Sequence, residues 1–134
     1  MEDKVKLDFL TIRERIKTLK LPQVDHVIGI GSGGVVPASL IAYELGAPLT
    51  ILSINYRAPN NIPRFDKPQL LADFSLPDLQ KRLLLVDDVS VSGKTLSLAL
   101  SLLEGYKVET LVMKGNADIV CFPEIRSCVN WPWH

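Results

Sequence analysis

The chain has 134 residues, of which 47% are hydrophobic, so it holds enough apolar material for one ordinary domain and is too short for a second catalytic one. Its 15 basic and 15 acidic side chains cancel, which excludes a general electrostatic attraction to nucleic acid or to anionic membranes. The N-terminus is too charged for a signal peptide, and no apolar run approaches the roughly 20 residues of a membrane span. We therefore expect a single cytoplasmic domain over residues 1–134, with its two cysteines, Cys121 and Cys128, reduced.

The first half of the chain reads as helix, strand, glycine turn, helix and strand. Apolar side chains recur at helical spacing over residues 11–20, where Thr11 and Glu14 have the spacing of a capping box. A short apolar run at 24–30 predicts a strand, and it is followed by the turn GSGG and a helical pattern that closes on Gly46. Residues 49–54 predict a second buried strand.

The pattern fails between residues 55 and 80, a stretch with four prolines and scattered charge. A loop of that length inside a compact domain is usually functional, which makes it a candidate active-site lid. A plain surface insertion is the alternative.

The second half repeats the alternation of short apolar runs with a helical pattern. Residues 83–86 and 108–113 predict buried strands, and residues 95–104 predict a helix that ends before Gly105. Strands that alternate with helices predict an α/β fold, a three-layer αβα arrangement around a central, mainly parallel sheet. Ligands of such folds bind at the carboxyl ends of the strands, where both of the turns discussed next are expected.

The glycine turn after the first strand matches G-x-G-x-x-G through Gly29, Gly31 and Gly34. A dinucleotide site would require an acidic residue about 20 positions further on, and residues 53–56 are not acidic. Backbone amides of Ser32, Gly33 and Gly34 can instead form an anion nest, because glycines let a ligand approach the backbone closely. A tight turn without a ligand is the remaining alternative.

The segment 83–95, LLLVDDVSVSGKT, places two adjacent carboxylates, Asp87 and Asp88, at the end of a buried strand and before a turn that opens a helix. Successive amides, several hydroxyls and the positive end of the helix make a phosphate nest, and the carboxylates can accept hydrogen bonds from vicinal sugar hydroxyls. This combination suits a 5-phosphorylated ribose. The predicted phosphate-binding residues are Val89, Ser90, Val91, Ser92, Gly93, Lys94 and Thr95.

A nucleoside triphosphate P-loop is the competing interpretation of the same segment, because it also ends in GKT. Its leading glycine would fall at Asp88, however, and a carboxylate there would repel the phosphates. The sugar-phosphate interpretation is therefore favoured.

These residues resemble the signature of the type I phosphoribosyltransferases, a buried strand, two acidic residues and a turn ending in a variant of T-G-x-T. The resemblance implies that fold with a small hood from the termini, a pyrophosphate loop at Ser32, Gly33 and Gly34, and a flexible catalytic loop at about 55–80 that includes Tyr56 and Arg57. It also implies phosphoribosyl pyrophosphate and a nucleobase, or the product nucleoside monophosphate, as ligands. By the same resemblance, Asp87 and Asp88 would be the catalytic pair and would hold Mg²⁺ through water. The protein would form a homo-oligomer such as a dimer or tetramer.

Within the family, the layout is similar to that of the xanthine-guanine type of purine phosphoribosyltransferase, which carries a Pro-Trp pair where this chain has Pro132 and Trp133. By that resemblance Lys114 reads the purine and Val129 packs on it. Cys128 stands where the subgroup has an aromatic residue.

Two positions depart from the family pattern. Val91 stands where 6-oxopurine enzymes usually carry an aspartate, and a valine neither accepts nor donates a proton. Ser32 stands where the pyrophosphate loop often presents an arginine, a charge that Arg57, Arg64 or Lys67 would then supply. The expected function is phosphoribosyl transfer to a purine-like base, and a non-catalytic nucleotide-binding regulator of the same fold is the alternative.

Overall fold

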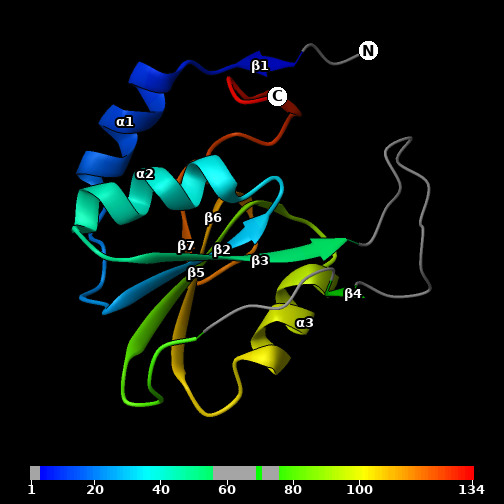
Figure 1. Ribbon diagram of the computed structural model, residues 1–134. Coiled ribbons are helices and arrows are strands. Elements are labelled where there is room, and N and C mark those ends of the chain that lie inside the picture. Colours follow the sequence, from blue (N-terminus) through cyan, green and yellow to red (C-terminus); the bar gives the residue numbers. More distant parts are fainter. Residues whose placement is uncertain (1–3, 56–68, 71–75) are drawn as a thin grey trace.

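A computed structural model describes residues 4–55, 69–70 and 76–134 of the chain (Figure 1). The predicted lid residues Tyr56, Arg57, Arg64 and Lys67 lie outside the described residues. The elements are β1 (Val5–Lys6), α1 (Phe9–Thr18), β2 (His26–Gly31), α2 (Val35–Leu45), β3 (Leu49–Asn55), β4 (Gln69–Leu70), β5 (Arg82–Ser90), α3 (Lys94–Leu102), β6 (Lys107–Gly115), β7 (Ile119–Val120) and β8 (Val129–Asn130).

The central sheet has the strand order β4-β3-β2-β5-β6-β7, and all neighbours are parallel except β3 and β4. Helices α1 and α2 lie over one face and α3 over the other (Figure 1). Side chains of β5 alternate between the two faces, so that Leu84 and Val86 join the core under α1 and α2 while Leu83 and Leu85 join the core under α3. The predicted three-layer α/β fold with a mainly parallel sheet is therefore confirmed.

Both ends of the chain meet in a second, two-stranded sheet in which Val5 of β1 pairs with Val129 of β8. Behind it Trp131 is buried, with its ring centroid 6.4 Å from that of Phe122 and 5.1 Å from that of Trp133, on which it stacks. These aromatic contacts provide the apolar burial that a pair of two-residue strands lacks. This sheet is the hood expected from the termini.

Helix α1 begins earlier than its sequence pattern predicts. Asp8 is the N-cap, and its Oδ1 accepts the Thr11 amide at 2.8 Å, so the capping box expected at Thr11 and Glu14 was wrong. An aspartate is a strong N-cap, and the earlier start still buries Ile12 and Ile16. Helix α2 ends as predicted, with Gly46 in the left-handed conformation at φ 65°.

Strands extend further toward the candidate site than the apolar runs indicated. Strand β5 continues through Asp87 to Ser90, and β6 continues to Gly115, because the two backbones go on pairing after the apolar residues end. The short strands β1, β4, β7 and β8 were not predicted, since two residues carry no periodic signal. Both cysteines are free, as expected, and within the described ranges no helix has the length and apolarity to cross a membrane.

One arginine ties α1 to the segment that leads into the hood. Arg15 donates from Nη1 to the Cys121 carbonyl at 2.5 Å, and its two terminal nitrogens contact Glu124 at 3.0 and 2.6 Å. The guanidinium also lies 4.4 Å from the centroid of the Phe122 ring. The bidentate ion pair lowers the pKa of Glu124 to about 2.

We expect Arg15→Met to lower the free energy of unfolding by about 1–3 kcal/mol, because it removes charged hydrogen bonds and leaves the carbonyl of the buried Cys121 without this donor. Urea titration followed by circular dichroism measures the change. Glu124→Gln is the matched control: it weakens only the solvent-exposed ion pair and should cost less than about 1 kcal/mol. Equal losses in the two variants would contradict the role given to the Cys121 carbonyl.

Candidate functional site

The glycine turn follows β2, and the acidic pair lies near the end of β5, which is the parallel neighbour of β2. The glycine turn and the acidic pair are in contact. A Cβ added to Gly33 would lie 2.6 Å from Oδ2 and 2.8 Å from Oδ1 of Asp88. A Cβ added to Gly34 would lie 2.6 Å from the Ile30 oxygen and 2.8 Å from the Val86 oxygen. At Gly34 a side chain would collide with backbone, and at Gly33 it would have to displace the Asp88 carboxylate, so glycines at these positions bring the two sequence-predicted turns together.

Asp87 and Asp88 are held by backbone amides at the end of β5. The Asp88 amide donates to Asp87 Oδ1 at 2.8 Å, and the Val89 amide donates to Asp88 Oδ1 at 2.7 Å. Asp87 is 7% exposed, and burial, followed by repulsion from Asp88, raises the pKa of Asp87 to about 8. Two adjacent carboxylates of this kind favour a ligand that brings hydrogen-bond donors or positive charge.

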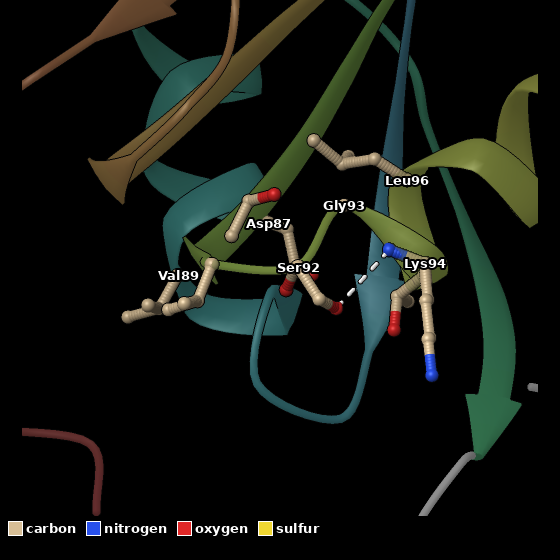
Figure 2. A pocket seen from close by; sticks show the side chains of 9 residues that line it. Asp87, Val89, Ser92, Gly93, Lys94 and Leu96 are labelled. Atoms are coloured by element: carbon tan, nitrogen blue, oxygen red, sulfur yellow. Dashed lines mark hydrogen bonds between the residues drawn. The ribbon is translucent and has the colours of Figure 1, made fainter.

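The predicted phosphate turn encloses a cavity of about 370 Å³ between β5 and the start of α3 (Figure 2). Gly93, with φ 80°, is the N-cap of α3 and provides no side-chain cap for the helix amides. The Lys94 amide donates to Ser92 Oγ at 3.3 Å, and Ser90 Oγ is buried without a hydrogen-bond partner among the described residues. The cavity is lined by Asp87, Val89, Ser90, Val91, Ser92, Gly93, Lys94, Thr95 and Leu96.

A helix start whose N-cap is a glycine, beside a buried and unpaired hydroxyl, is suited to an anion. The first amides of a helix carry partial positive charge and lack intrahelical acceptors, and phosphate oxygens can accept from them and from hydroxyl groups. A phosphate in the cavity would lie next to Asp87, which also lines it. The arrangement can therefore hold an anionic group and hydroxyl donors side by side.

The other predicted residues lie in several different elements. Val91 lies at the mouth of the turn with 79% of its surface exposed, and Ser32 is exposed in the glycine turn. Lys114 is half-buried in β6 and pairs in register with Val89, whereas Val129 lies in β8 of the hood and packs on the core under α1 and α2. The base-binding roles of Lys114 and Val129 stay predictions.

Sequence reasoning missed two residues that contact the site. Gly115 has φ 118°, and a Cβ added there would lie 2.0 Å from the Ser90 oxygen, which also accepts the Asn116 amide at 3.0 Å. His134 places Nε2 at 3.4 Å from Asp88 Oδ2. A glycine ending an apolar run was the available signal for Gly115, whereas nothing in the sequence linked His134 to a residue 46 positions away.

We expect Asp87→Asn to stabilise the ligand-free protein above pH 8. The unfolded pKa of an aspartate is about 3.9, so between about pH 4 and pH 8 the folded state binds the extra proton and stability falls as pH rises. An asparagine removes this loss and still accepts the Asp88 amide. Thermal melts at pH 9 should show a gain of roughly 3 °C or more, while the exposed control Asp78→Asn should show none. A lower melting temperature for Asp87→Asn at pH 9 would count against this account.

We expect Gly115→Ala to be more destabilising than Gly46→Ala. Both glycines have positive φ, 118° and 65°, so alanine carries a backbone cost of about 1–3 kcal/mol at either position. Only at Gly115 does the new Cβ also meet backbone atoms, since nothing lies within 4 Å of a Cβ at Gly46. Urea denaturation compares the two variants, and equal losses would show that β6 moves away from Ser90 without cost.

Comparison with known proteins agrees with this geometry. A model of the phosphoribosyl transferase domain matches residues 11–131. The crystal structure of a purine phosphoribosyltransferase from Pyrococcus horikoshii is similar with a TM-score of 0.79 and 25% identity, over 99% of this chain and 95% of that one.

Curated relatives point to the same family. The chain is 34% identical over 100 residues to the orotate phosphoribosyltransferase of Sulfurisphaera tokodaii, covering 73% of this chain and 47% of that protein. It is 29% identical over 106 residues to the adenine phosphoribosyltransferase of Nitrosomonas eutropha, covering 71% of this chain and 58% of that protein. The chain thus spans about half the length of these two relatives. The match of the phosphoribosyl transferase domain over most of the chain, together with the glycine turn and the acidic pair, shows that the chain belongs to the phosphoribosyltransferases.

Proposed function

We propose that this chain transfers 5-phosphoribose from phosphoribosyl pyrophosphate to a purine-like base and releases pyrophosphate. The observation that carries the proposal is the contact between Gly33 and Asp88, which brings the two turns predicted to bind anions together at the carboxylate pair. A phosphorylated sugar with a pyrophosphate at C1 has anions at both ends and hydroxyls between them. Membership of the family supports the transferase class.

Each part of the ligand has a matching part of the site in this proposal. The 5-phosphate takes the cavity at the start of α3, where helix amides, Ser90 Oγ and Ser92 contribute. The ribose hydroxyls donate to Asp87 and Asp88, and the pyrophosphate accepts from the backbone of residues 32–34. Anchoring the sugar at both ends aligns C1 for attack by a base nitrogen: the bond from nitrogen to C1 forms, the bond from C1 to the pyrophosphate oxygen breaks, and pyrophosphate leaves with that electron pair.

The acidic pair also suits a magnesium ion bound together with the ligand. Among the described residues, no group of three or more His, Cys, Asp or Glu side chains is placed to hold a metal alone. Mg²⁺ commonly uses one or two carboxylates, several waters and substrate phosphates, and Asp87 and Asp88 would hold it through water. When bound, the ion would neutralise charge that develops on the departing pyrophosphate.

Two lines of support favour a purine-like base: the resemblance in layout to the xanthine-guanine type, and the bases used by similar proteins. The structurally similar protein from Pyrococcus horikoshii is a purine phosphoribosyltransferase, whereas the curated relatives use adenine or orotate. Lys114, beside the end of β5, would face a polar edge of the base, and Val129 would support its ring. Val91 provides no proton acceptor, so loss of a proton from the base would depend on solvent or on another residue.

The proposal is tested by pyrophosphate release. Purified protein with phosphoribosyl pyrophosphate, Mg²⁺ and a panel of purine and pyrimidine bases should release pyrophosphate with at least one base, measured by a coupled colour assay. Asp88→Asn should bind phosphoribosyl pyrophosphate about 10-fold more weakly in calorimetry, because a charge-assisted hydrogen bond is lost. Its melting temperature should be unchanged, because asparagine can still accept the Val89 amide.

Two outcomes would redirect the assignment. Tight binding of phosphoribosyl pyrophosphate without turnover on any base would favour the non-catalytic alternative, which the absence of an aspartate at Val91 and of an arginine at Ser32 also suits. No binding by the native protein would reject both functions. Glu44→Gln, an exposed carboxylate on α2, is the control for nonspecific charge effects.

A further inference from the structure

The last residues of the chain follow a packed path that ends at the acidic pair. Trp131 is buried and Trp133 stacks on it, and the His134 amide donates to the Trp131 carbonyl at 3.2 Å. This turn directs the His134 ring toward β5, where Nε2 lies 3.4 Å from Asp88 Oδ2. Aromatic packing in the hood therefore determines where the imidazole is held.

The surroundings of Asp88 leave one side of its carboxylate open. Oδ1 accepts the Val89 amide at 2.7 Å, and the Gly33 backbone closes the side that faces the glycine turn. His134 contacts Oδ2, while 18% of the Asp88 side chain stays exposed. When two donors bind the same carboxylate oxygen, their donor atoms lie about 5 Å apart. A ligand hydroxyl or hydrated cation that binds Asp88 Oδ2 must therefore lie beside the His134 ring.

We propose that His134 is a ligand-positioning residue: it holds the Asp88 carboxylate toward the ribosyl hydroxyls and forms the wall of the site on the hood side. The inference rests on the proposed function, because it assigns the ligand at Asp88 to a phosphoribosyl group. The contact requires a proton on Nε2, which both the neutral Nε2–H tautomer and the protonated imidazole carry. A carboxylate oxygen has room for this donor and for a sugar hydroxyl.

The fold itself has little need of this side chain. The ring is 57% exposed, and its contact with Asp88 is at the long end of the hydrogen-bonding range. Removal of such an exposed contact costs little stability. A change in ligand affinity after removal of the ring can therefore be separated from a change in folding.

The test compares His134→Ala and His134→Gln with the native protein, using calorimetry with phosphoribosyl pyrophosphate and Mg²⁺. We expect His134→Ala to weaken binding about 3- to 10-fold, because the donor to Oδ2 and the wall are lost together. His134→Gln should bind within about 2-fold of the native protein, because its amide N–H can donate to the same oxygen. In turnover assays the alanine variant should raise KM for the sugar substrate and leave kcat nearly unchanged.

Arg126→Ala is the matched control, because Arg126 is an exposed residue in the same C-terminal segment. It should change neither affinity nor melting temperature. Unchanged binding in His134→Ala would overturn the inference, and so would tighter binding, which would mean that the imidazole competes with the ligand for Asp88. Failure of the native protein to bind the sugar substrate would instead reject the proposed function, so the two failures are distinguishable.

Discussion

The close approach of the glycine turn to the end of β5 is the constraint on which the candidate site depends. Gly33 lies against the Asp88 carboxylate, and Gly34 lies so close to the backbone of β2 and β5 that a Cβ atom there would be 2.6 Å from the Ile30 oxygen. Since the strands are parallel neighbours, both turns emerge at the same edge of the sheet. A larger residue at Gly34 would collide with the backbones of β2 and β5, and one at Gly33 would displace the Asp88 carboxylate from its present position.

The same edge of the sheet concentrates polar groups that the protein alone does not satisfy. Asp87 is buried next to a second carboxylate, Ser90 Oγ lacks a partner in the described part of the chain, and Gly93 leaves the start of α3 without a side-chain cap. Each of these features disfavours the ligand-free fold. A bound phosphate, sugar hydroxyls and a cation would offset all three, which is the usual relation between stability and function at a binding site.

The hood connects this edge to both ends of the chain. Pairing of β1 with β8 and the Arg15 contacts with Cys121 and Glu124 hold the C-terminal segment on the domain. Stacked tryptophans then carry the segment to Asp88, where His134 makes its contact. Residues at the two ends of the sequence thereby help to build a site whose recognisable motif lies near its middle.

Local sequence determined the longer elements and carried the prediction of what the two turns bind. Apolar runs identified the four longer strands and Gly46 marked the end of α2, because these signals depend on neighbouring residues. The adjacent carboxylates before a Ser/Gly/Thr turn predicted the sugar-phosphate motif in the same way. Tertiary structure decided which residues meet. Three contacts join residues 25 to 55 positions apart: Gly33 packs on Asp88, Gly115 avoids a clash with Ser90, and His134 contacts Asp88. The burial that raises the pKa of Asp87 also comes from tertiary packing. Such contacts arise from strand order and close packing, which no local pattern in the sequence encodes.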